Sequence, residues 1–253
     1  MSGESYRSLA AAYDALTEDV GYERRAAFLQ RLFGRAERDV TRVLDLACGT
    51  GSITLLLSRA GYELVGVDNA PDMLAQARAK FDGESPLFLC QSMPRLTLGE
   101  QRVDAAVCCL DSINYLTRAQ DVQKTFRRVY ESLNDGGVFV FDVHGAAKMA
   151  ALDGQVWLDE TDEVYCVWRT EYRRRSGMLD YWVDLFTRSA AGDWQRGFEE
   201  HHQRFYSSEE LTAWLHAAGF CGVKTHGDCR LRAPREDEGR IYFSCIKKEH
   251  KHG

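Results

Sequence analysis

The chain has 253 residues, of which 45% are hydrophobic and 28% charged, with 21 glycines and 4 prolines. This composition excludes collagen-like, low-complexity and largely disordered chains, and the length suffices for one large domain with its own core. The net charge of −6 comes from 32 basic and 38 acidic residues, so the broad positive field typical of proteins that bind nucleic acid or anionic membranes is missing.

The absence of recognisable targeting signals and the spacing of the cysteines favour a location inside the cell. No apolar run approaches the about 18 to 20 residues that span a membrane, and residues 1–10 lack a signal-peptide pattern. We therefore expect a cytoplasmic protein without a membrane partner. The cysteines form no Cys-x-x-Cys pair and several lie in apolar runs, which favours reduced core thiols over disulfides or a metal site.

Short apolar runs alternate with amphipathic stretches from residue 42 to about 143, the pattern of βαβ units around a parallel sheet. Asn69 is expected to cap one of the helices, with Pro71 in its first turn. The predicted strands are 42–47, 62–68, 87–90, 103–109 and 138–143, and the predicted helices are 53–59, 70–80 and 118–133.

The pattern changes after the fifth predicted strand. Alternating stretches rich in Trp, Tyr, Phe and Val, broken at 175–177 and 191–193, predict an antiparallel sheet inserted at 155–205. Ser207 and Glu210 have capping-box spacing, so a helix should begin there, followed by two last strands at 220–225 and 240–246. We expect a core of residues 1–154 and 206–253, with residues 1–40 as its helical cover.

A glycine-containing loop follows the first predicted strand. In Asp45-Leu46-Ala47-Cys48-Gly49-Thr50-Gly51 the glycines let a ligand approach the backbone, and the helix that follows offers free N–H groups. Asp68, at the end of the second strand, can accept hydrogen bonds from both hydroxyls of a ribose. The alternative interpretation is that the loop is only a tight turn between strand and helix, with an N-cap aspartate and no bound ligand.

Two common nucleotide-binding motifs are incomplete in this loop, and this narrows the class of ligand that it could bind. A dinucleotide motif would need glycine where Thr54 stands, and the Walker motif lacks its Gly-Lys-Ser/Thr ending. Asp45 would repel phosphate but attract an ammonium group. An adenosine that carries a cationic amino-acid chain satisfies both ends, and that ligand is S-adenosylmethionine.

The stretches VLDLACGTG at 43–51 and VGVD at 65–68 resemble the first two motifs of class I S-adenosylmethionine-dependent methyltransferases. The resemblance covers most of the chain. It implies an α/β fold, with a Rossmann-like, mostly parallel sheet of seven strands whose last strand is antiparallel, and helices on both faces. Ala47 departs from the fullest family motif, which has the first of three glycines there.

The resemblance also implies roles for individual residues. Asp45 and the turn from Gly49 to Gly51 would hold the aminocarboxypropyl group, Asp68 the ribose and Met73 one face of the adenine. Ser92 or Gln91 stands where many family members bind the adenine amino group with an aspartate. The remaining expected cofactor contacts are Ala47, Asn69, Met93 and Leu110, and no metal ligands are expected.

Methyl transfer from a sulfonium needs no covalent nucleophile, but an amine or hydroxyl acceptor must lose a proton. His144, after the fifth strand, and His201, in Glu199-Glu200-His201-His202, are candidate catalytic residues. Strand alternation should turn one Glu/His pair to each side of that strand. Tyr13, with Asp14, resembles a Tyr-Asp pair of small-molecule methyltransferases that approaches the methyl site. A strand-end histidine, a solvated strand face and a core tyrosine are the non-catalytic alternatives.

The sequence thus predicts a methyltransferase that acts on an amine or hydroxyl of a small molecule, with S-adenosylmethionine as cofactor. The inserted sheet would cover the substrate, form the interface of a homodimer, or do both. An RNA or protein methyltransferase is the nearest alternative and would show a basic channel or peptide groove beside the cofactor. A non-catalytic nucleotide-binding module would instead show a blocked methyl-facing mouth.

Overall fold

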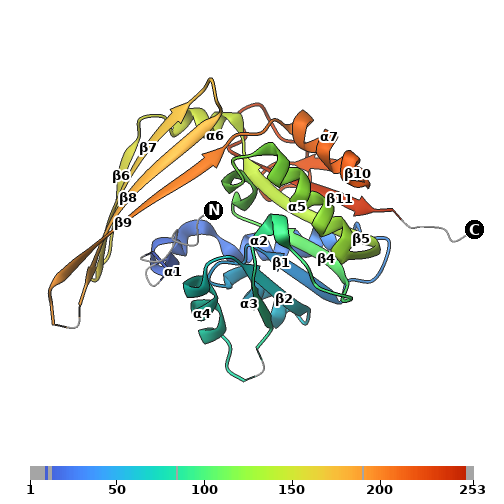
Figure 1. Cartoon of the computed structure of the whole chain (residues 1–253), viewed down its shortest axis with the longest axis horizontal. Coiled ribbons are helices and arrows are strands. Elements are labelled where there is room, and N and C mark those ends of the chain that lie inside the picture. The colour runs from blue at the N-terminus through green and yellow to red at the C-terminus, as the bar shows by residue number, and fades with distance from the viewer. Residues whose placement is uncertain (1–8, 11–12, 84, 190, 249–253) are drawn as a thin grey trace, which may run out of the picture.

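A computed structural model describes residues 9–10, 13–83, 85–189 and 191–248. Two sheets dominate it: a central sheet flanked by helices, and a second sheet that arches away from the core (Figure 1). Within the described residues, no helix has the length and apolar character needed to cross a membrane. The eight cysteines are all free thiols.

The central sheet has seven strands in the order β10-β11-β5-β4-β1-β2-β3. Neighbouring strands from β5 to β3 are parallel, whereas β11 runs antiparallel to both β5 and β10. This confirms the predicted fold class. The strands are β1 (Arg42–Leu46), β2 (Glu63–Asp68), β3 (Leu87–Cys90), β4 (Val103–Cys108), β5 (Leu133–His144), β10 (Phe220–His226) and β11 (Arg240–Lys247).

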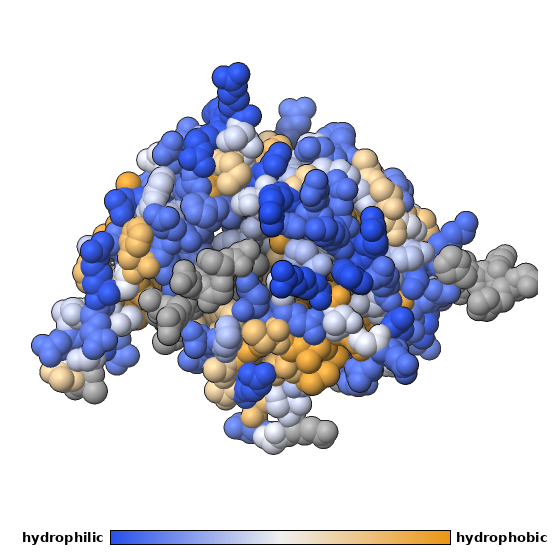
Figure 2. Space-filling view, in the orientation of Figure 1, coloured by the Kyte–Doolittle hydropathy of each residue, from blue (hydrophilic) through white to orange (hydrophobic). Residues whose placement is uncertain are grey.

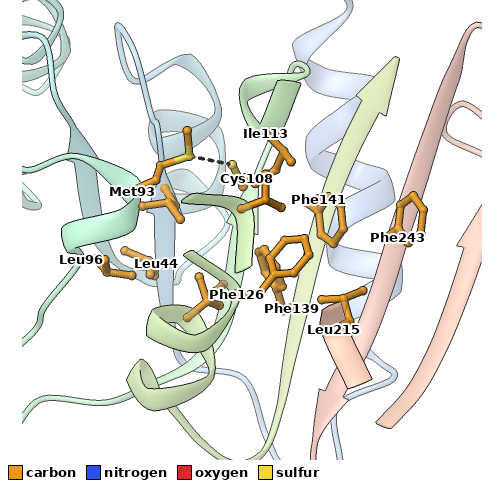
Figure 3. Packing of buried hydrophobic residues seen from close by; sticks show 14 of the residues in the cluster. Leu44, Met93, Leu96, Cys108, Ile113, Phe126, Phe139, Phe141, Leu215 and Phe243 are labelled. Atoms are coloured by element: carbon orange, nitrogen blue, oxygen red, sulfur yellow. Dashed lines mark hydrogen bonds between the residues drawn. The ribbon is translucent and has the colours of Figure 1, made fainter. Parts of the chain in front are cut away.

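Helices cover both faces of this sheet because its strands are apolar on both sides. Val43 packs with α2 (Tyr22–Phe33) and α3 (Ser52–Arg59), whereas the next residue, Leu44, packs on the opposite side with α5 (Ala119–Ser132) and α7 (Ser208–Ala218). Figure 3 shows the second cluster, in which the rings of Phe141 and Phe243 stack at 4.9 Å between centroids. The two clusters fix the strand ends on which the site is built.

The inserted sheet consists of β6 (Val156–Glu160), β7 (Val164–Arg173), β8 (Met178–Arg188) and β9 (Trp194–Arg204), in that order and all antiparallel. The predicted breaks at 175–177 and 191–193 are confirmed, but the turn between β6 and β7 was not predicted. The Thr161 hydroxyl accepts the N–H groups of Glu163 and Val164, so a threonine forms this turn without glycine or proline.

Two local predictions were wrong. Asn69 does not cap α4 (Pro71–Ala79); Ala70 is the N-cap, and its N–H is taken by the Asp68 carboxylate at 2.9 Å. β5 begins at Leu133, five residues before the predicted start, because Leu133 already pairs with Val103. Gly136 has a φ of 77°, so the glycine pair lies inside an irregular part of the strand rather than before it.

The N-terminal part is helical only in places. Its described elements before α2 are α1 (Tyr13–Leu16) and the 3-10 turn η1 (Glu18–Val20). Residues 1–8 and 11–12 of the predicted cover lie outside the described residues. Two short 3-10 turns, η2 (Met93–Arg95) and η3 (Ser112–Tyr115), follow β3 and β4, and α6 (Ala146–Ala151) connects β5 to the inserted sheet.

On the face shown in Figure 2, the surface is mostly hydrophilic, and hydrophobic residues gather mainly at the lower part of the core. Leu87, at the start of the edge strand β3, is 46% exposed. The inserted sheet adds four more exposed apolar side chains, Val156, Leu158, Trp194 and Phe198.

Candidate active site

A cavity opens where β1, β2 and β4 end. It encloses about 700 Å³ when the open space at its mouth is included. Seven of the ten predicted cofactor residues line it, as does Tyr13; the seven are Asp45, Ala47, Gly49, Asp68, Asn69, Met73 and Leu110. The parallel strands bring these residues together because their carboxyl ends meet at one edge of the sheet.

The glycine loop forms the floor of this cavity. A Cβ added at Gly49 would meet no atom within 4 Å, so this position leaves the backbone open to a ligand. A Cβ at Gly51 would lie 3.0 Å from the Ala77 Cβ, so this glycine permits close packing of α3 on α4. Ala47 adopts a φ of 58°, a conformation that costs a residue with a Cβ about 1 to 2 kcal/mol.

Asp68 is held by the loop that it faces. One carboxylate oxygen accepts the N–H of Gly49 at 2.9 Å and the other accepts the N–H of Ala70 at 2.9 Å. Burial raises the pKa of Asp68, and these backbone hydrogen bonds oppose the rise. A carboxylate has about four lone-pair sites, so acceptor capacity is left for the hydroxyls of a ligand.

Asp45 is buried at the end of β1, with 2% of its surface exposed. Its carboxylate accepts the Thr54 hydroxyl at 2.6 Å, at the position where a dinucleotide-binding loop would have glycine. Burial, aided by the charge of Asp68, raises the pKa of Asp45 to about 7. A cation bound beside Asp45 would favour its ionised form.

Asp14 ties the N-terminal segment to the glycine loop. Its carboxylate accepts the Thr50 hydroxyl at 2.6 Å and pairs with the Lys80 ammonium at 2.7 Å. Lys80 also donates to the Ser52 hydroxyl at 2.8 Å, at the start of α3. The neighbouring Tyr13 is thereby fixed in the cavity wall, where burial raises the pKa of its phenol well above the usual value.

A second compartment adjoins the first and shares Asn69 and Tyr115 with it. Ser92 and Met93 line this compartment. Gln91, the alternative to Ser92, exchanges two hydrogen bonds with the backbone of Thr97, so its amide is already engaged. Met93 is almost fully buried and also packs in the core, where its sulfur lies 3.8 Å from the Cys108 sulfur (Figure 3).

A buried polar cluster lies beyond β4. Leu110 and Asp111 have φ angles of 58° and 53°, and the Asp142 carboxylate of β5 accepts both of their N–H groups at 2.9 Å. The Asp111 carboxylate accepts hydrogen bonds from Gln203 and Arg240, each at 2.7 Å. Arg240 also pairs with Asp142, so it joins the two acids.

The charge states in this cluster follow from its contacts. Burial opposes ionisation of Asp111, but neighbouring His144 and Arg240 outweigh it and lower the pKa of this carboxyl. Burial lowers the pKa of His144, whose Nε2 lies 3.4 Å from an Asp111 oxygen. The two aspartates raise the pKa of Arg240 against the effect of its burial, so the guanidinium stays charged.

The two predicted catalytic histidines do not line the cavity. His144 contacts Asp111, and its backbone N–H donates to the Asn114 side chain. His201 is buried on the inner face of β9, 3.2 Å from Glu199, with its ring edge-on to Tyr115. Strand alternation was predicted correctly, because Glu199 and His201 are buried while Glu200 and His202 are exposed.

Sequence reasoning missed the polar cluster. Asp111 follows β4 and Asp142 lies near the end of β5, the adjacent parallel strand, a signal that could have paired them. Gln203 and Arg240 come from the inserted sheet and from β11, and no spacing in the chain relates them to Asp111. Among the described residues, no group of His, Cys, Asp and Glu is arranged to hold a metal ion.

A Rossmann-like sheet with a glycine loop after β1, an acid at the end of β2 and a reversed strand β11 defines the class I methyltransferase fold. Residues 43–137 match a family model described as a methyltransferase domain. A protein of Geobacillus sp. (strain WCH70) with a provisional methyltransferase name is 30% identical over 247 residues, 96% of this chain and 100% of that protein.

Solved methyltransferase structures are similar to this chain over most of its length. An S-adenosylmethionine-dependent methyltransferase from Clostridium acetobutylicum ATCC 824 is 27% identical, with a TM-score of 0.85 over 96% of this chain and 99% of that one. The sugar N-methyltransferase KedS8 from Streptoalloteichus sp. ATCC 53650 shares the fold, at 23% identity and a TM-score of 0.76 over 94% and 93% of the two chains. The chain belongs to the methyltransferase family and is an S-adenosylmethionine-dependent enzyme.

Proposed function

We propose that the protein transfers a methyl group from S-adenosylmethionine to an amine or hydroxyl of a small molecule. The observation that carries this proposal is the cavity in which Asp45, Gly49 and Asp68 converge at the strand ends. The open space beside Gly49 and the buried acid at Asp45 suit a ligand that approaches the backbone and carries a cationic amino group.

Each part of the cofactor has a matching residue in this proposal. Asp68 accepts from the ribose hydroxyls, Asp45 attracts the amino group, and Met73 packs on the adenine with Ser92 and Asn69 at its rim. The sulfonium supplies the transferable methyl, so the chain's contribution is to hold donor and acceptor in line. Such positioning can lower a barrier by about 7 to 11 kcal/mol.

Tyr13 is the predicted catalytic residue that lines the cavity, and we place it beside the transferable methyl. His144 and His201 lie behind the cavity wall, so we assign them as positioning residues that act through Asp111 and Tyr115. This assignment keeps the three predicted residues but gives only Tyr13 a direct contact with the reacting groups.

Closure of the site supports a small acceptor. The Leu9 N–H donates to the Glu199 carboxylate of β9 at 2.9 Å, and the Leu9 side chain packs with Val164 and Val183 of the inserted sheet. A few residues further on, Asp14 is bound to the glycine loop. The N-terminal segment therefore joins the inserted sheet to the cofactor cavity, an arrangement that favours a small acceptor over a polymer.

The RNA and protein alternatives receive less support. The second compartment has Arg95, Arg118 and Lys124 at its rim, with Asp121 as the one acid, which pairs with Arg118 and Lys124. These cations form a local basic patch on a chain with a net charge of −6, whereas a nucleic acid strand is typically bound along an extended basic surface. The cavity is open on one side, which favours turnover over a purely non-catalytic module.

The outer face of the inserted sheet is where we place the contact of the predicted homodimer. Trp194 and Phe198, about half exposed, alternate with charged side chains along β9. Exposed aromatic side chains are typical of contact surfaces. Sedimentation of the wild-type chain and of a Trp194→Ser, Phe198→Ser variant should give a dimer and a monomer, respectively; a monomeric wild type would contradict the proposal.

Calorimetric titration tests the cofactor part. We expect S-adenosylmethionine and S-adenosylhomocysteine to bind, whereas NAD should not, because Thr54 replaces the third glycine of a dinucleotide-binding loop. Transfer of labelled methyl to members of a small-molecule library then tests the acceptor part. Preferential binding of NAD, or labelling of RNA or protein in place of small molecules, would overturn the proposal.

A further inference from the structure

Thr54 lies in the first turn of α3 and contacts a residue of the cofactor cavity. Its hydroxyl donates to the Asp45 carboxylate at 2.6 Å, and both residues are almost fully buried. Asp45 lines the cavity, whereas Thr54 is not among the described residues that do. Any effect of the Thr54 hydroxyl on a bound ligand must therefore pass through Asp45.

The titratable groups that face Asp45 supply no positive charge. They are the Asp68 carboxylate at the end of β2 and the thiols of Cys48 in the glycine loop, Cys108 on β4 and Cys109 after it. Burial raises the pKa of each thiol well above its usual value, so the thiols stay uncharged. Within the described part of the chain, hydrogen bonds alone stabilise the ionised form of Asp45.

Thr54 supplies these hydrogen bonds. Burial raises the pKa of Asp45, and the hydroxyl and the backbone N–H of Thr54 both oppose this rise. A hydrogen bond to an ionised group is stronger than one between neutral groups, so the hydroxyl favours the carboxylate over the neutral acid. A dinucleotide-binding loop has glycine at this position, and glycine offers no hydroxyl. The residue that departs from that motif is therefore the one that holds the acid.

We infer that Thr54 is a positioning residue, which holds the Asp45 carboxylate in place for the amino group of S-adenosylmethionine and so makes the cavity prefer a nucleoside with a cationic amino-acid chain. A carboxylate has about four lone-pair sites, of which Thr54 takes two, so acceptor capacity is left for the N–H groups of an ammonium. The inference rests on the proposed function, which assigns that amino group to Asp45.

The test compares S-adenosylhomocysteine with desamino-S-adenosylhomocysteine, the same molecule without its amino group. Each is titrated into the full chain and into a Thr54→Val variant. At pH 7 the variant should bind S-adenosylhomocysteine about fivefold more weakly, because loss of the hydroxyl raises the pKa of Asp45 further and leaves less of it ionised. At pH 8.5 the carboxyl is ionised in both chains, so the difference should fall below about twofold.

The desamino analogue should not bind more weakly to Thr54→Val at either pH, since it has no ammonium group for Asp45 to attract. Equal weakening of the two ligands would overturn the inference. It would also be overturned if Thr54→Val bound S-adenosylhomocysteine at pH 7 as tightly as the wild type.

Further variants show whether Thr54 acts through Asp45. Thr54→Ser keeps the hydroxyl and should restore the affinity and the pH profile of the wild type. In an Asp45→Asn background, Thr54→Val should cause no additional loss. If Thr54→Val does not fold, Thr54→Ala removes the same hydroxyl and should show the same loss at pH 7. A loss in Thr54→Ser as large as that in Thr54→Val, or an additional loss in the Asp45→Asn background, would contradict the inference.

Thr125→Val is the matched control. Thr125 is also fully buried in a helix, and its hydroxyl donates to the Asp121 carbonyl of α5 at 2.8 Å. It is not among the described residues that line the cofactor cavity. Its substitution should leave the affinity for S-adenosylhomocysteine unchanged at both pH values, and a loss equal to that of Thr54→Val would contradict the inference.

The titrations separate this inference from the proposed function. If S-adenosylhomocysteine does not bind the wild-type chain, or if Asp45→Asn binds it as tightly as the wild type, the proposed role of Asp45 fails. If Asp45→Asn weakens binding while Thr54→Val leaves it unchanged, only the inference about Thr54 fails.

Discussion

The two halves of the site are built in different ways. In the cofactor half, Asp45, Gly49, Thr54 and Asp68 lie within 24 residues of one βαβ unit and contact one another directly. In the acceptor half, Asp111, Asp142, Gln203 and Arg240 come from four separate parts of the chain. A local motif therefore builds the cofactor half, whereas tertiary structure alone assembles the polar cluster that we place on the acceptor side.

The largest expected effect of a single substitution lies in the acceptor half. Arg240→Leu removes the cation shared by Asp111 and Asp142 and leaves two buried acids without it. We expect the free energy of unfolding, measured by urea denaturation, to fall by about 3 to 5 kcal/mol. Arg118→Leu breaks only an exposed pair with Asp121 and should cost less than about 0.5 kcal/mol. Equal losses would show that the cluster is not the stabilising feature described.

In the cofactor half, the corresponding loss should appear in binding rather than folding. Asp68→Ala deletes a charged acceptor and should weaken S-adenosylmethionine binding by about 1.5 to 3 kcal/mol in a calorimetric titration. Asp72→Ala, an exposed acid in the first turn of α4, is the matched control and should leave affinity unchanged. An Asp68→Ala variant with wild-type affinity would reject Asp68 as the ribose ligand.

A smaller effect on cofactor affinity should appear when the pH is lowered. Because the pKa of Asp45 is raised to about 7, this carboxyl is protonated and uncharged in the empty site at lower pH. Its attraction for the cofactor's ammonium is therefore lost as pH falls, and affinity should drop by about fivefold between pH 7 and pH 6. Asp45→Asn should remove this dependence. A wild-type affinity that is constant over this range would place the amino group elsewhere.

The smallest effect should come from the contacts that hold the N-terminal segment against the glycine loop. Lys80→Met removes the ammonium that links Asp14 to Ser52, while the Thr50 hydroxyl still binds Asp14. We expect cofactor affinity to weaken by about 0.5 to 1 kcal/mol, mainly through faster dissociation in stopped-flow measurements. Lys124→Met, which breaks a long exposed pair, serves as the control. Faster association in Lys80→Met, with unchanged dissociation, would argue against a closing role for this contact.

The same contrast explains what the sequence could predict. Hydrophobic runs and glycines mark the strands and the cofactor loop locally, so β1, β3 and the capping box at Ser207 were placed correctly. The turn at Thr161 escaped notice because a hydroxyl replaces the usual glycine or proline. His144 was identified from its position after a strand, but its partner Asp111 depends on how β4 and β5 align.

Gln203 and Arg240 show most clearly what could not be predicted from the sequence. Each is an ordinary polar residue on a strand, with a neighbouring sequence that gives no reason to single it out. Their importance arises only when the inserted sheet and the reversed strand β11 approach the end of β4. Side chains that meet through such long-range packing carry no local signature.

A crystal structure of the chain with S-adenosylhomocysteine tests the central claim most directly. The account predicts the ribose hydroxyls on Asp68, the amino group beside Asp45 and the sulfur facing Tyr13. A cofactor bound with its ribose away from Asp68, or with its amino group away from Asp45, would contradict the account.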